Sequence, residues 1–252
     1  MAASLDDGTE HLRLLVVDVG CLFVTSTGGR LGRMNSPDRP RAPRLFFAGC
    51  AGGNLLRLRL DVSAETARRA LALAEREPPW VDPAATPACL RGFIDLLSAQ
   101  AAAEPAGAAL IYRLPSGLDF DVPASIVRSG TPQGEQLLSR LAADGMPPAL
   151  AQAGFVGAGD FWEPWCVALV GDEIAAMAFA ARIGEAGAEV GVYTFPGYRS
   201  RGLAAAVTAA WSRLPQLADR ALFYSTLAKN LSSRRVAERL GLRRIGVSVS
   251  ID

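Results

Sequence analysis

The stretch 192–204, VYTFPGYRSRGLA, decides the fold of this 252-residue chain, because an apolar strand runs through a basic turn into a helix. Gly202 and Ala204 have small side chains, so backbone N–H groups at the start of that helix stay uncovered. The positive end of the helix dipole favours an anion there, and Arg199 and Arg201 stand beside it. The stretch is therefore a candidate phosphate-binding turn. The alternative is a basic turn before a helix of small residues, and the motif alone does not separate the two.

Composition places the chain among globular proteins with a balanced charge. Half of the residues are apolar, and 26 Lys and Arg stand against 25 Asp and Glu. This balance predicts no nucleic-acid-binding surface. No apolar run approaches the roughly 20 residues of a membrane-spanning helix, so no membrane partner is expected. Residues 1–11 lack the pattern of a signal peptide and are predicted to be a frayed tail of a cytoplasmic protein.

The scarcity of histidine excludes several catalytic schemes. His11 is the single histidine and lies among acidic residues, which argues against Ser-His-Asp, Cys-His and zinc chemistry. The four cysteines have no C-x-x-C spacing and mostly lie in apolar runs, so neither a disulfide framework nor a metal site is predicted. A general base must then be a carboxylate, a tyrosine or a water held by backbone groups.

The first 105 residues alternate apolar runs with turn signals, which predicts a small antiparallel sheet followed by two helices. The predicted strands cover 12–19, 21–26, 44–48 and 55–60. The glycines at 28–29 and 52–53 suit hairpin tips better than phosphate loops, because neither pair opens an apolar helix. Helices are predicted at 64–77, with Ser63 as N-cap, and at 86–103. A composition shift near 105 predicts a boundary between an N-terminal domain, 1–105, and a C-terminal domain, 106–252.

The C-terminal half has a regular pattern that predicts an α+β fold with a mixed central sheet. A strand at 108–114 and a helix at 134–143 precede a βββαβαβ order. The predicted elements of that order are strands at 165–170, 174–183 and 188–195, a helix at 203–214, a strand at 221–227, a helix at 231–240 and a strand at 244–251. A helical crossover joins parallel neighbours, so the strands flanking 203–214 should pair in parallel.

Two ordered motifs resemble one family. The stretch 192–204 resembles the acyl-CoA signature of the GNAT superfamily of N-acetyltransferases, in which Q/R-x-x-G-x-G/A follows a strand; Arg199, Gly202 and Ala204 fill its fixed places. The block 230–242, NLSSRRVAERLGL, is similar to the family's N-x-x-S helix with its Leu-Gly turn. The resemblance covers 108–252, and the N-terminal part loosely resembles an extra domain of some bacterial GNAT-like proteins.

The resemblance implies an N-acetyltransferase that moves an acetyl group from acetyl-CoA to a primary amine by direct attack in a ternary complex, without a metal. It assigns the following residues to acetyl-CoA: Tyr193, Thr194, Arg199, Ser200, Arg201, Gly202, Leu203, Ala204, Asn230 and Ser233. The turn would bind the pyrophosphate, the strand would pair with the pantetheine arm where it splays from its neighbour, and Asn230 would lie near the sulfur. The amine acceptor is not identified by the sequence, and N-terminal sheet edges are compatible with a homodimer.

The resemblance places the general base at Glu189, where many GNAT enzymes carry one. A base is useful because only roughly 1 in 2,500 lysine-like amines is neutral at pH 7. The alternative role for Glu189 is a solvated carboxylate at a strand end. Ala237 stands where the family commonly has a tyrosine general acid, which leaves that role to Tyr224, to another tyrosine or to solvent. The departure supports a second interpretation, a catalytically degenerate acyl-CoA-binding regulatory module.

Two further groups of residues have open interpretations. The aromatic residues of 155–165 suit either an acceptor pocket wall or, as we favour, a loop packed on the core. Arg234 and Arg235 suit a solvated helix face, or a contact to the 3′-phosphate of CoA. A dinucleotide-binding fold is excluded because the glycine pattern is not G-x-G-x-x-G and follows three antiparallel strands.

Overall fold

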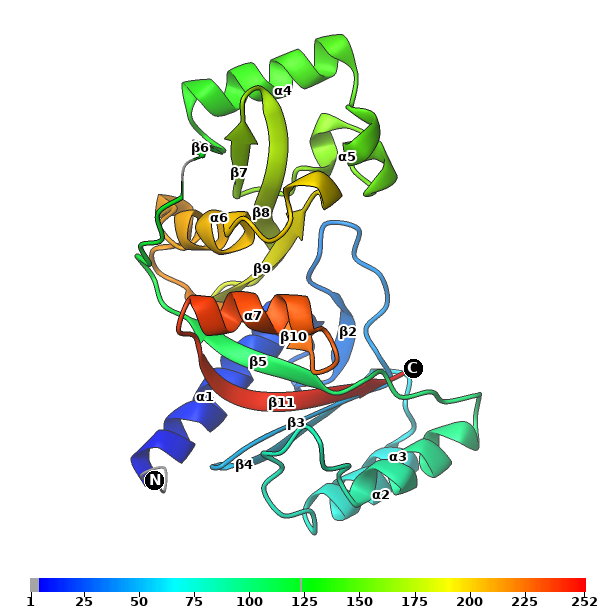
Figure 1. Cartoon of the computed structure of the whole chain (residues 1–252). Helices are drawn as coiled ribbons and strands as arrows, with labels where there is room; N and C mark the ends of the chain where they lie inside the picture. The colour runs from blue at the N-terminus through cyan, green and yellow to red at the C-terminus, as the bar shows by residue number, and fades with distance from the viewer. Residues whose placement is uncertain (1–4, 123) are drawn as a thin grey trace.

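One nine-stranded sheet forms the centre of the computed structural model, which describes residues 5–122 and 124–252 (Figure 1). The strand order across it is β4-β3-β11-β5-β10-β9-β8-β7-β6. The strands are β3 (Leu45–Cys50), β4 (Gly53–Leu58), β5 (Ala109–Leu114), β6 (Ser125–Arg128), β7 (Trp165–Val170), β8 (Glu173–Ile183), β9 (Gly187–Thr194), β10 (Ala221–Leu227) and β11 (Arg243–Ile251). Within the described chain only β9 and β10 run parallel to each other. A separate antiparallel hairpin joins β1 (Phe23–Thr25) and β2 (Leu31–Met34).

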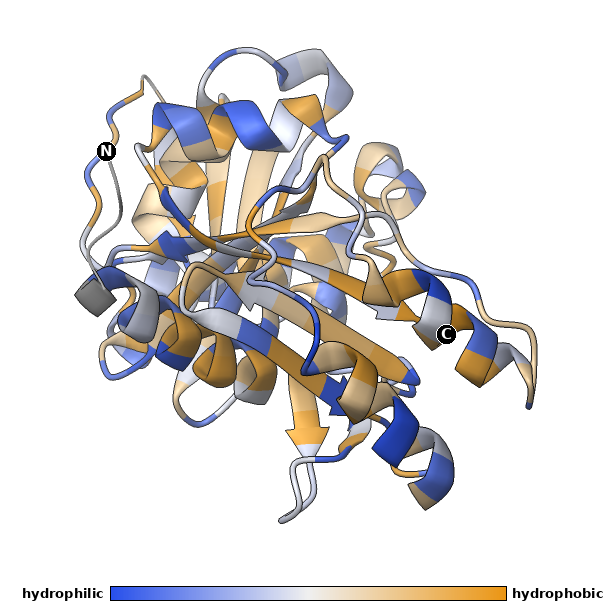
Figure 2. Ribbon diagram, turned by 90° about the horizontal axis from the view of Figure 1, so that it is seen from below, coloured by the Kyte–Doolittle hydropathy of each residue, from blue (hydrophilic) through white to orange (hydrophobic). Residues whose placement is uncertain are grey.

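Helices cover both faces of this sheet. They are α1 (Leu5–Leu22), α2 (Ala64–Ala74), α3 (Cys89–Ser98), α4 (Pro132–Asp144), α5 (Pro148–Gln152), α6 (Leu203–Trp211) and α7 (Leu231–Arg239). Alternate residues of β3 divide the core between the two faces: Phe47 packs with Phe93 of α3, whereas Phe46 belongs to the cluster under α1. Apolar colour accordingly follows the strands and the helix faces turned toward them (Figure 2).

The N-terminal helix α1 corrects two sequence predictions. Residues 12–19 are helical and are not a strand, and residues 5–11 are the start of that helix and are not a frayed tail. The run at 14–17 is apolar throughout and resembles a buried strand, but Leu15 and Val19 point into the core while Val16 is 48% exposed. The apolar side chains that are buried have helical spacing, which a continuous apolar run conceals. Residues 1–4 of the predicted tail lie outside the described residues.

The C-terminal half follows the predicted order. Strands β7 and β10 have the predicted bounds, and the predicted helix at 203–214 corresponds to α6. The helical crossover does join a parallel pair, as expected. Strand β5 lies between β10 and β11 and is antiparallel to both, which the order of elements along the chain did not indicate.

The N-terminal hairpin of β3 and β4 is antiparallel, as predicted, and extends the large sheet. Val249 of β11 pairs with Phe47 of β3, so strands from both ends of the chain are neighbours in one sheet. The predicted tips also occur where the glycines indicated, between β1 and β2 and between β3 and β4. The boundary near residue 105 falls between α3 and β5 and stays a prediction.

Candidate functional site

The two parallel strands of the sheet diverge, and this divergence creates the site. Strands β9 and β10 share three residue pairs, from Gly187 with Ala221 to Glu189 with Phe223. Beyond these pairs β9 continues to Thr194 and β10 to Leu227 without further pairing to each other in the described chain. Backbone groups on the facing edges are therefore free for an extended ligand.

A cavity of about 600 Å³ opens at this divergence. It is bounded by the end of β9, by Tyr224 of β10 and by the first turns of α6 and α7. Its walls include nine of the residues predicted to hold the cofactor: Tyr193, Thr194, Arg199, Ser200, Gly202, Leu203, Ala204, Asn230 and Ser233. The oxygen Oγ1 of Thr194 is buried and has no hydrogen-bond partner among the described residues. The structure thus brings residues of both sequence motifs to one cavity.

The basic turn before α6 has the backbone of an anion cradle. Ser200 and Gly202 adopt left-handed φ angles of 65° and 83°, which turn the chain sharply into the helix. Gly202 is the N-cap of α6, and no side chain caps this terminus in the described chain. The amides of the first turn therefore keep their hydrogen-bonding capacity beside the cavity that Gly202, Leu203 and Ala204 line, where the helix dipole favours negative charge.

Three arginines line the cavity: Arg199 before α6, and Arg235 and Arg239 on α7. Arg201, which the sequence predicted as a cofactor contact, is not among the lining residues; its guanidinium lies over the Tyr198 ring and donates to the carbonyl of Gly197 at 3.1 Å. Arg239 was missed because it lies at the far end of α7 in sequence. In the structure its guanidinium nevertheless lies beside the turn, since an atom added to Gly202 as Cβ would stand 3.4 Å from Arg239 Nη1.

The start of α7 brings a tyrosine and two polar residues together. Asn230 caps the helix, since its Oδ1 accepts a hydrogen bond from the Ser233 amide at 3.1 Å. The Tyr224 hydroxyl donates to the Ser233 carbonyl at 3.2 Å and lies 2.6 Å from Ser233 Oγ. Burial raises the pKa of Tyr224, and the hydrogen bond with Ser233 opposes that shift. Tyr224 therefore stays protonated at neutral pH and can donate a proton into the cavity. Ala237 is completely buried.

Glu189 is buried, which corrects the idea that it is a solvated strand end. It is 5% exposed, and its Oε2 lies 2.6 Å from Nη1 of Arg182 on β8. It is not among the residues lining the cavity. Side chains alternate along β9, so Glu189 projects from the opposite sheet face to Val190, and that face is covered by α1.

The aromatic residues of 155–165 are chiefly core, as favoured from the sequence. Phe155, Phe161 and Trp165 are buried in one hydrophobic cluster with apolar side chains of β7 and β8. Trp162 is half-buried and contacts the Phe179 ring edge-on at 5.9 Å. Arg234 donates to the carbonyl of Ala228 at 3.3 Å, whereas its neighbour Arg235 lines the cavity.

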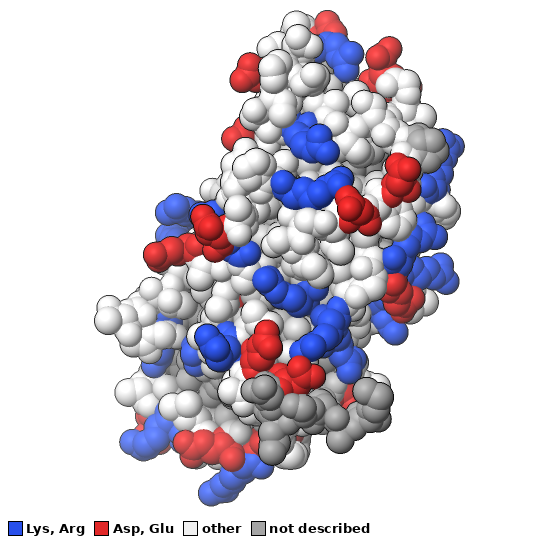
Figure 3. All heavy atoms as spheres, turned by 90° about the vertical axis from the view of Figure 1, so that its left-hand side faces the viewer, with Lys and Arg blue, Asp and Glu red and all other residues white. Residues whose placement is uncertain are grey.

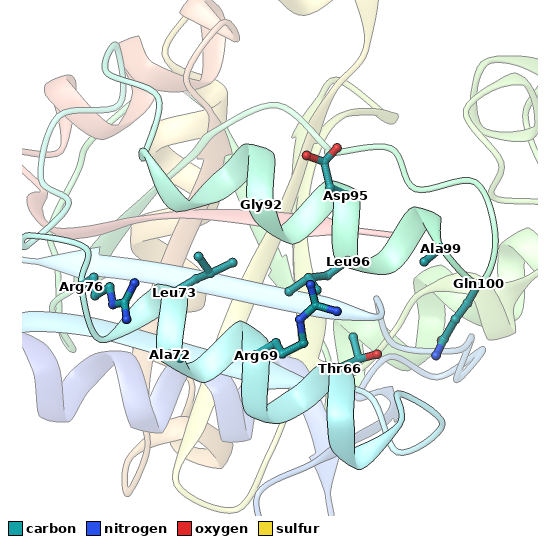
Figure 4. A pocket seen from close by; sticks show the side chains of 10 residues that line it. All are labelled: Thr66, Arg69, Ala72, Leu73, Arg76, Gly92, Asp95, Leu96, Ala99 and Gln100. Carbon is teal, nitrogen blue, oxygen red and sulfur yellow. The ribbon is translucent and has the colours of Figure 1, made fainter.

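A second hollow lies between α2 and α3, far from these motifs (Figure 4). Arg69 and Leu96 approach each other across it, while Asp95 points away (Figure 4). Among the described residues that line it, none forms a left-handed turn or an uncapped helix start like those of the first cavity. On the face shown in Figure 3, basic and acidic side chains are interspersed. Among the described residues, no cluster of side chains suits a metal ion and no helix is long and apolar enough to cross a membrane.

Comparison with known proteins identifies a matching family for part of the chain. Residues 165–246, which contain β7 to α7 and the start of β11, match the family model described as GNAT acetyltransferase. No curated protein matched the chain. The family model thus covers the diverging strands, the basic turn and both helices of the cavity.

Several solved structures resemble the chain at low identity. A structure described as an acetyltransferase from the GNAT family of Novosphingobium aromaticivorans is 25% identical over 60% of this chain and 65% of its own, with a TM-score of 0.39. One from Colwellia psychrerythraea is 12% identical over 99% and 97%, with a TM-score of 0.44. A tandem GNAT protein from the clavulanic acid biosynthesis pathway is 13% identical over 100% and 96%, also at 0.44. The chain spans slightly less than two thirds of the first of these.

Proposed function

We propose that the protein transfers an acetyl group from acetyl-CoA to a primary amine by direct attack in a ternary complex, a proposal supported by the match of residues 165–246 to the GNAT acetyltransferase family model. The observation that carries this proposal is the cavity of about 600 Å³ at the divergence of β9 and β10, into which the starts of α6 and α7 point. Its size and its three arginines suit a large, anionic donor.

The proposed donor site divides into two chemical regions. The amides at the start of α6, together with Arg199, suit the two negative charges of a pyrophosphate. Arg235 and Arg239 suit the remaining phosphate of the cofactor. The free edge of β9 suits the amides of the pantetheine arm, and the Thr194 hydroxyl, which has no partner among the described residues, offers a further hydrogen bond.

In the proposed reaction, the neutral amine nitrogen attacks the thioester carbonyl carbon, the carbon–sulfur bond then breaks, and the nitrogen loses a proton to water as the amide forms. A backbone amide on the free edge of β9 would stabilise the negative oxygen that forms in between. Tyr224 would protonate the departing thiolate, in place of the tyrosine that Ala237 replaces. Glu189 does not line the cavity, so it would take the proton of the incoming ammonium through bridging water and not by direct contact.

The alternative proposal is a catalytically degenerate acyl-CoA-binding regulatory module. Two observations favour it: Ala237 is completely buried and offers no proton, and Glu189 already holds an ion pair with Arg182. The two proposals share the donor site and differ in turnover.

The experiment measures binding first and turnover second. Isothermal titration calorimetry with acetyl-CoA should give a saturable site, and Arg239→Ala should weaken it by about tenfold, as expected for one charge-assisted contact. Arg234→Ala is the matched control, because this arginine lies on the same helix, bonds the Ala228 carbonyl and is not among the lining residues. Equal affinities for the two variants would refute the donor site.

Turnover is then followed as free thiol released from acetyl-CoA across a panel of primary amines. Thiol release that depends on an amine supports the acetyltransferase. Tight acetyl-CoA binding without release for any amine of the panel supports the regulatory module instead.

A further inference from the structure

Asp18 of α1 is an ionisable side chain that the proposed reaction does not use. Its exposed fraction is 0%, and neither carboxyl oxygen has a hydrogen-bond partner among the described residues. Buried polar groups in folded proteins are nearly always satisfied, so an orphaned carboxyl needs a physical reason. Asp18 also lies outside the segment that matches the GNAT family.

The surroundings of Asp18 connect it to the proposed base. Its electrostatic neighbours are Glu189 on β9 and Arg182 on β8. On its own helix, the Cys21 thiol lies near Asp18 and Glu189 and donates to the Arg182 carbonyl at 3.7 Å. Helix α1 packs directly on β9, since an atom added to Gly187 as Cβ would meet Cys21 and Val17 within 3.3 Å.

Other charged groups that face α1 lie toward its start. Arg243 of β11 pairs with Asp7 and donates to His11, and Arg113 of β5 interacts with Glu10. The charge balance at Asp18 is therefore set by Glu189 and Arg182.

That balance contains two carboxyl groups and one guanidinium. Two carboxylates beside Arg182 would leave one negative charge buried without a partner, which is strongly unfavourable in a protein interior. Glu189 holds the ion pair at 2.6 Å, so the proton belongs on Asp18. In agreement, burial and the negative Glu189 raise the pKa of Asp18 well above its ordinary value, and Arg182 only partly opposes this.

We infer that Asp18 is held in its neutral form near the Glu189–Arg182 ion pair, so that the two carboxyl groups together hold one proton without a hydrogen bond between them, and that α1 seats on β8 and β9 only while Asp18 carries that proton. Asp18 is then a positioning residue for Glu189, an assignment that rests on the proposed function. When Asp18 releases its proton to solvent water, the buried charge loosens α1 and with it the setting of Glu189. The N-terminal helix thereby completes the proposed base site and limits activity on the alkaline side.

The first test does not depend on turnover. Infrared spectroscopy of the full chain at pH 7 detects the carbonyl stretch of a protonated carboxyl. The band should be present in the wild type and in the control Asp219→Asn, which changes an exposed carboxylate. It should be absent in Asp18→Asn. It should also be absent in Glu189→Gln, because Asp18 would then be the single carboxyl beside Arg182 and would ionise.

A band that persists in Asp18→Asn, or in Glu189→Gln, would overturn the carboxyl pair. The comparison of the two variants matters because a carboxyl kept neutral by burial alone would keep its band in Glu189→Gln. Glu189→Gln also serves where Asp18→Asn does not fold.

The second test is the pH profile of amine acetylation. The asparagine of Asp18→Asn cannot ionise, so the variant should keep the acid limb of the wild-type profile. On the alkaline side its loss of activity should be at least tenfold smaller than the loss in the wild type. Its affinity for acetyl-CoA at pH 7 should stay within twofold of the wild type. An alkaline limb identical to that of the wild type would overturn the positioning role. An absence of turnover in every variant would overturn the proposed function and leave the infrared result standing.

Discussion

Substitution of Gly202 by alanine tests whether the turn before α6 is the anion cradle. Gly202 has a φ of 83°, and an L-residue in this left-handed region is destabilised by roughly 1–2 kcal/mol. The added Cβ would also stand 3.3 Å from Val122 Cγ1 and 3.4 Å from Arg239 Nη1, so these groups must shift by a few tenths of an ångström. For a chain of this size we expect the melting temperature to fall by about 2–8 °C.

The matched control is Gly241→Ala. Gly241 has a φ of 62°, and an atom added there as Cβ meets nothing within 4 Å. It should lose a similar amount of stability from backbone strain alone. Because Gly241 does not line the cavity, acetyl-CoA binding should be unchanged. The pair of variants therefore separates strain from damage to the cradle.

The assay is thermal unfolding with and without acetyl-CoA at 100 times the wild-type Kd. Ligand at this concentration stabilises the wild type by about 2.7 kcal/mol. If Gly202→Ala weakens binding tenfold, the same concentration stabilises it by about 1.4 kcal/mol, and the ligand-induced shift in Tm is halved. A full ligand-induced shift in Gly202→Ala would refute the cradle. Melting at the wild-type temperature would refute the strain argument.

Three further predictions concern single side chains. Tyr224→Phe removes the hydroxyl beside Ser233, so thiol release should slow by about 10- to 100-fold while acetyl-CoA affinity stays within twofold; an unchanged rate in stopped-flow measurements would exclude Tyr224 as the acid. The pKa of Asp18 is higher in the folded protein than in the unfolded chain. The stability that this shift contributes is fully present below the unfolded pKa and is lost as the pH rises toward the folded pKa. The free energy of unfolding should fall by up to about 1.4 kcal/mol per pH unit in that window. Urea unfolding between about pH 5 and 8 should show this slope in the wild type, and equal slopes in Asp18→Asn would contradict it. Trp211→Phe removes one of two donors to the buried Pro164 carbonyl, the indole N–H at 2.8 Å, and leaves the Ala180 amide at 3.2 Å, so the free energy of unfolding should fall by about 0.5–1.5 kcal/mol; no loss in chemical denaturation would show that the indole bond contributes little.

The sequence predicted the parts of the site that are continuous in the chain. Strand β9, the basic turn and α6 follow one another within the stretch 187–211, and glycine, arginine and small residues each had a local reason to occur there. The place of Asn230 at the start of α7 followed from the second motif. These predictions depended on local periodicity and capping, which single sequences carry well.

Contacts between distant segments were beyond the sequence. Asp18 comes within electrostatic range of Glu189 only because α1 packs on β9, and no pattern in either segment indicates the other. The same reason explains why Arg239 lines the cavity and the predicted Arg201 does not. Arg201 packs on the Tyr198 ring, and Arg239 reaches the cavity through the placement of α7. Residues 12–19 were predicted to be a strand because of their continuous apolar run. In the structure they belong to helix α1, where packing against the sheet decides which side chains are buried.

The pairing of β11 with β3 has a consequence for the order in which the molecule can assemble. Val247 of β11 pairs with Gly49 of β3, a partner made roughly 200 residues earlier in synthesis. Until β11 leaves the ribosome, one edge of β3 has no strand beside it and remains open to other chains. Chaperone dependence and aggregation during expression should therefore concentrate in the interval before β11 emerges, and a nascent chain stalled before residue 243 should be far more aggregation-prone than the released one.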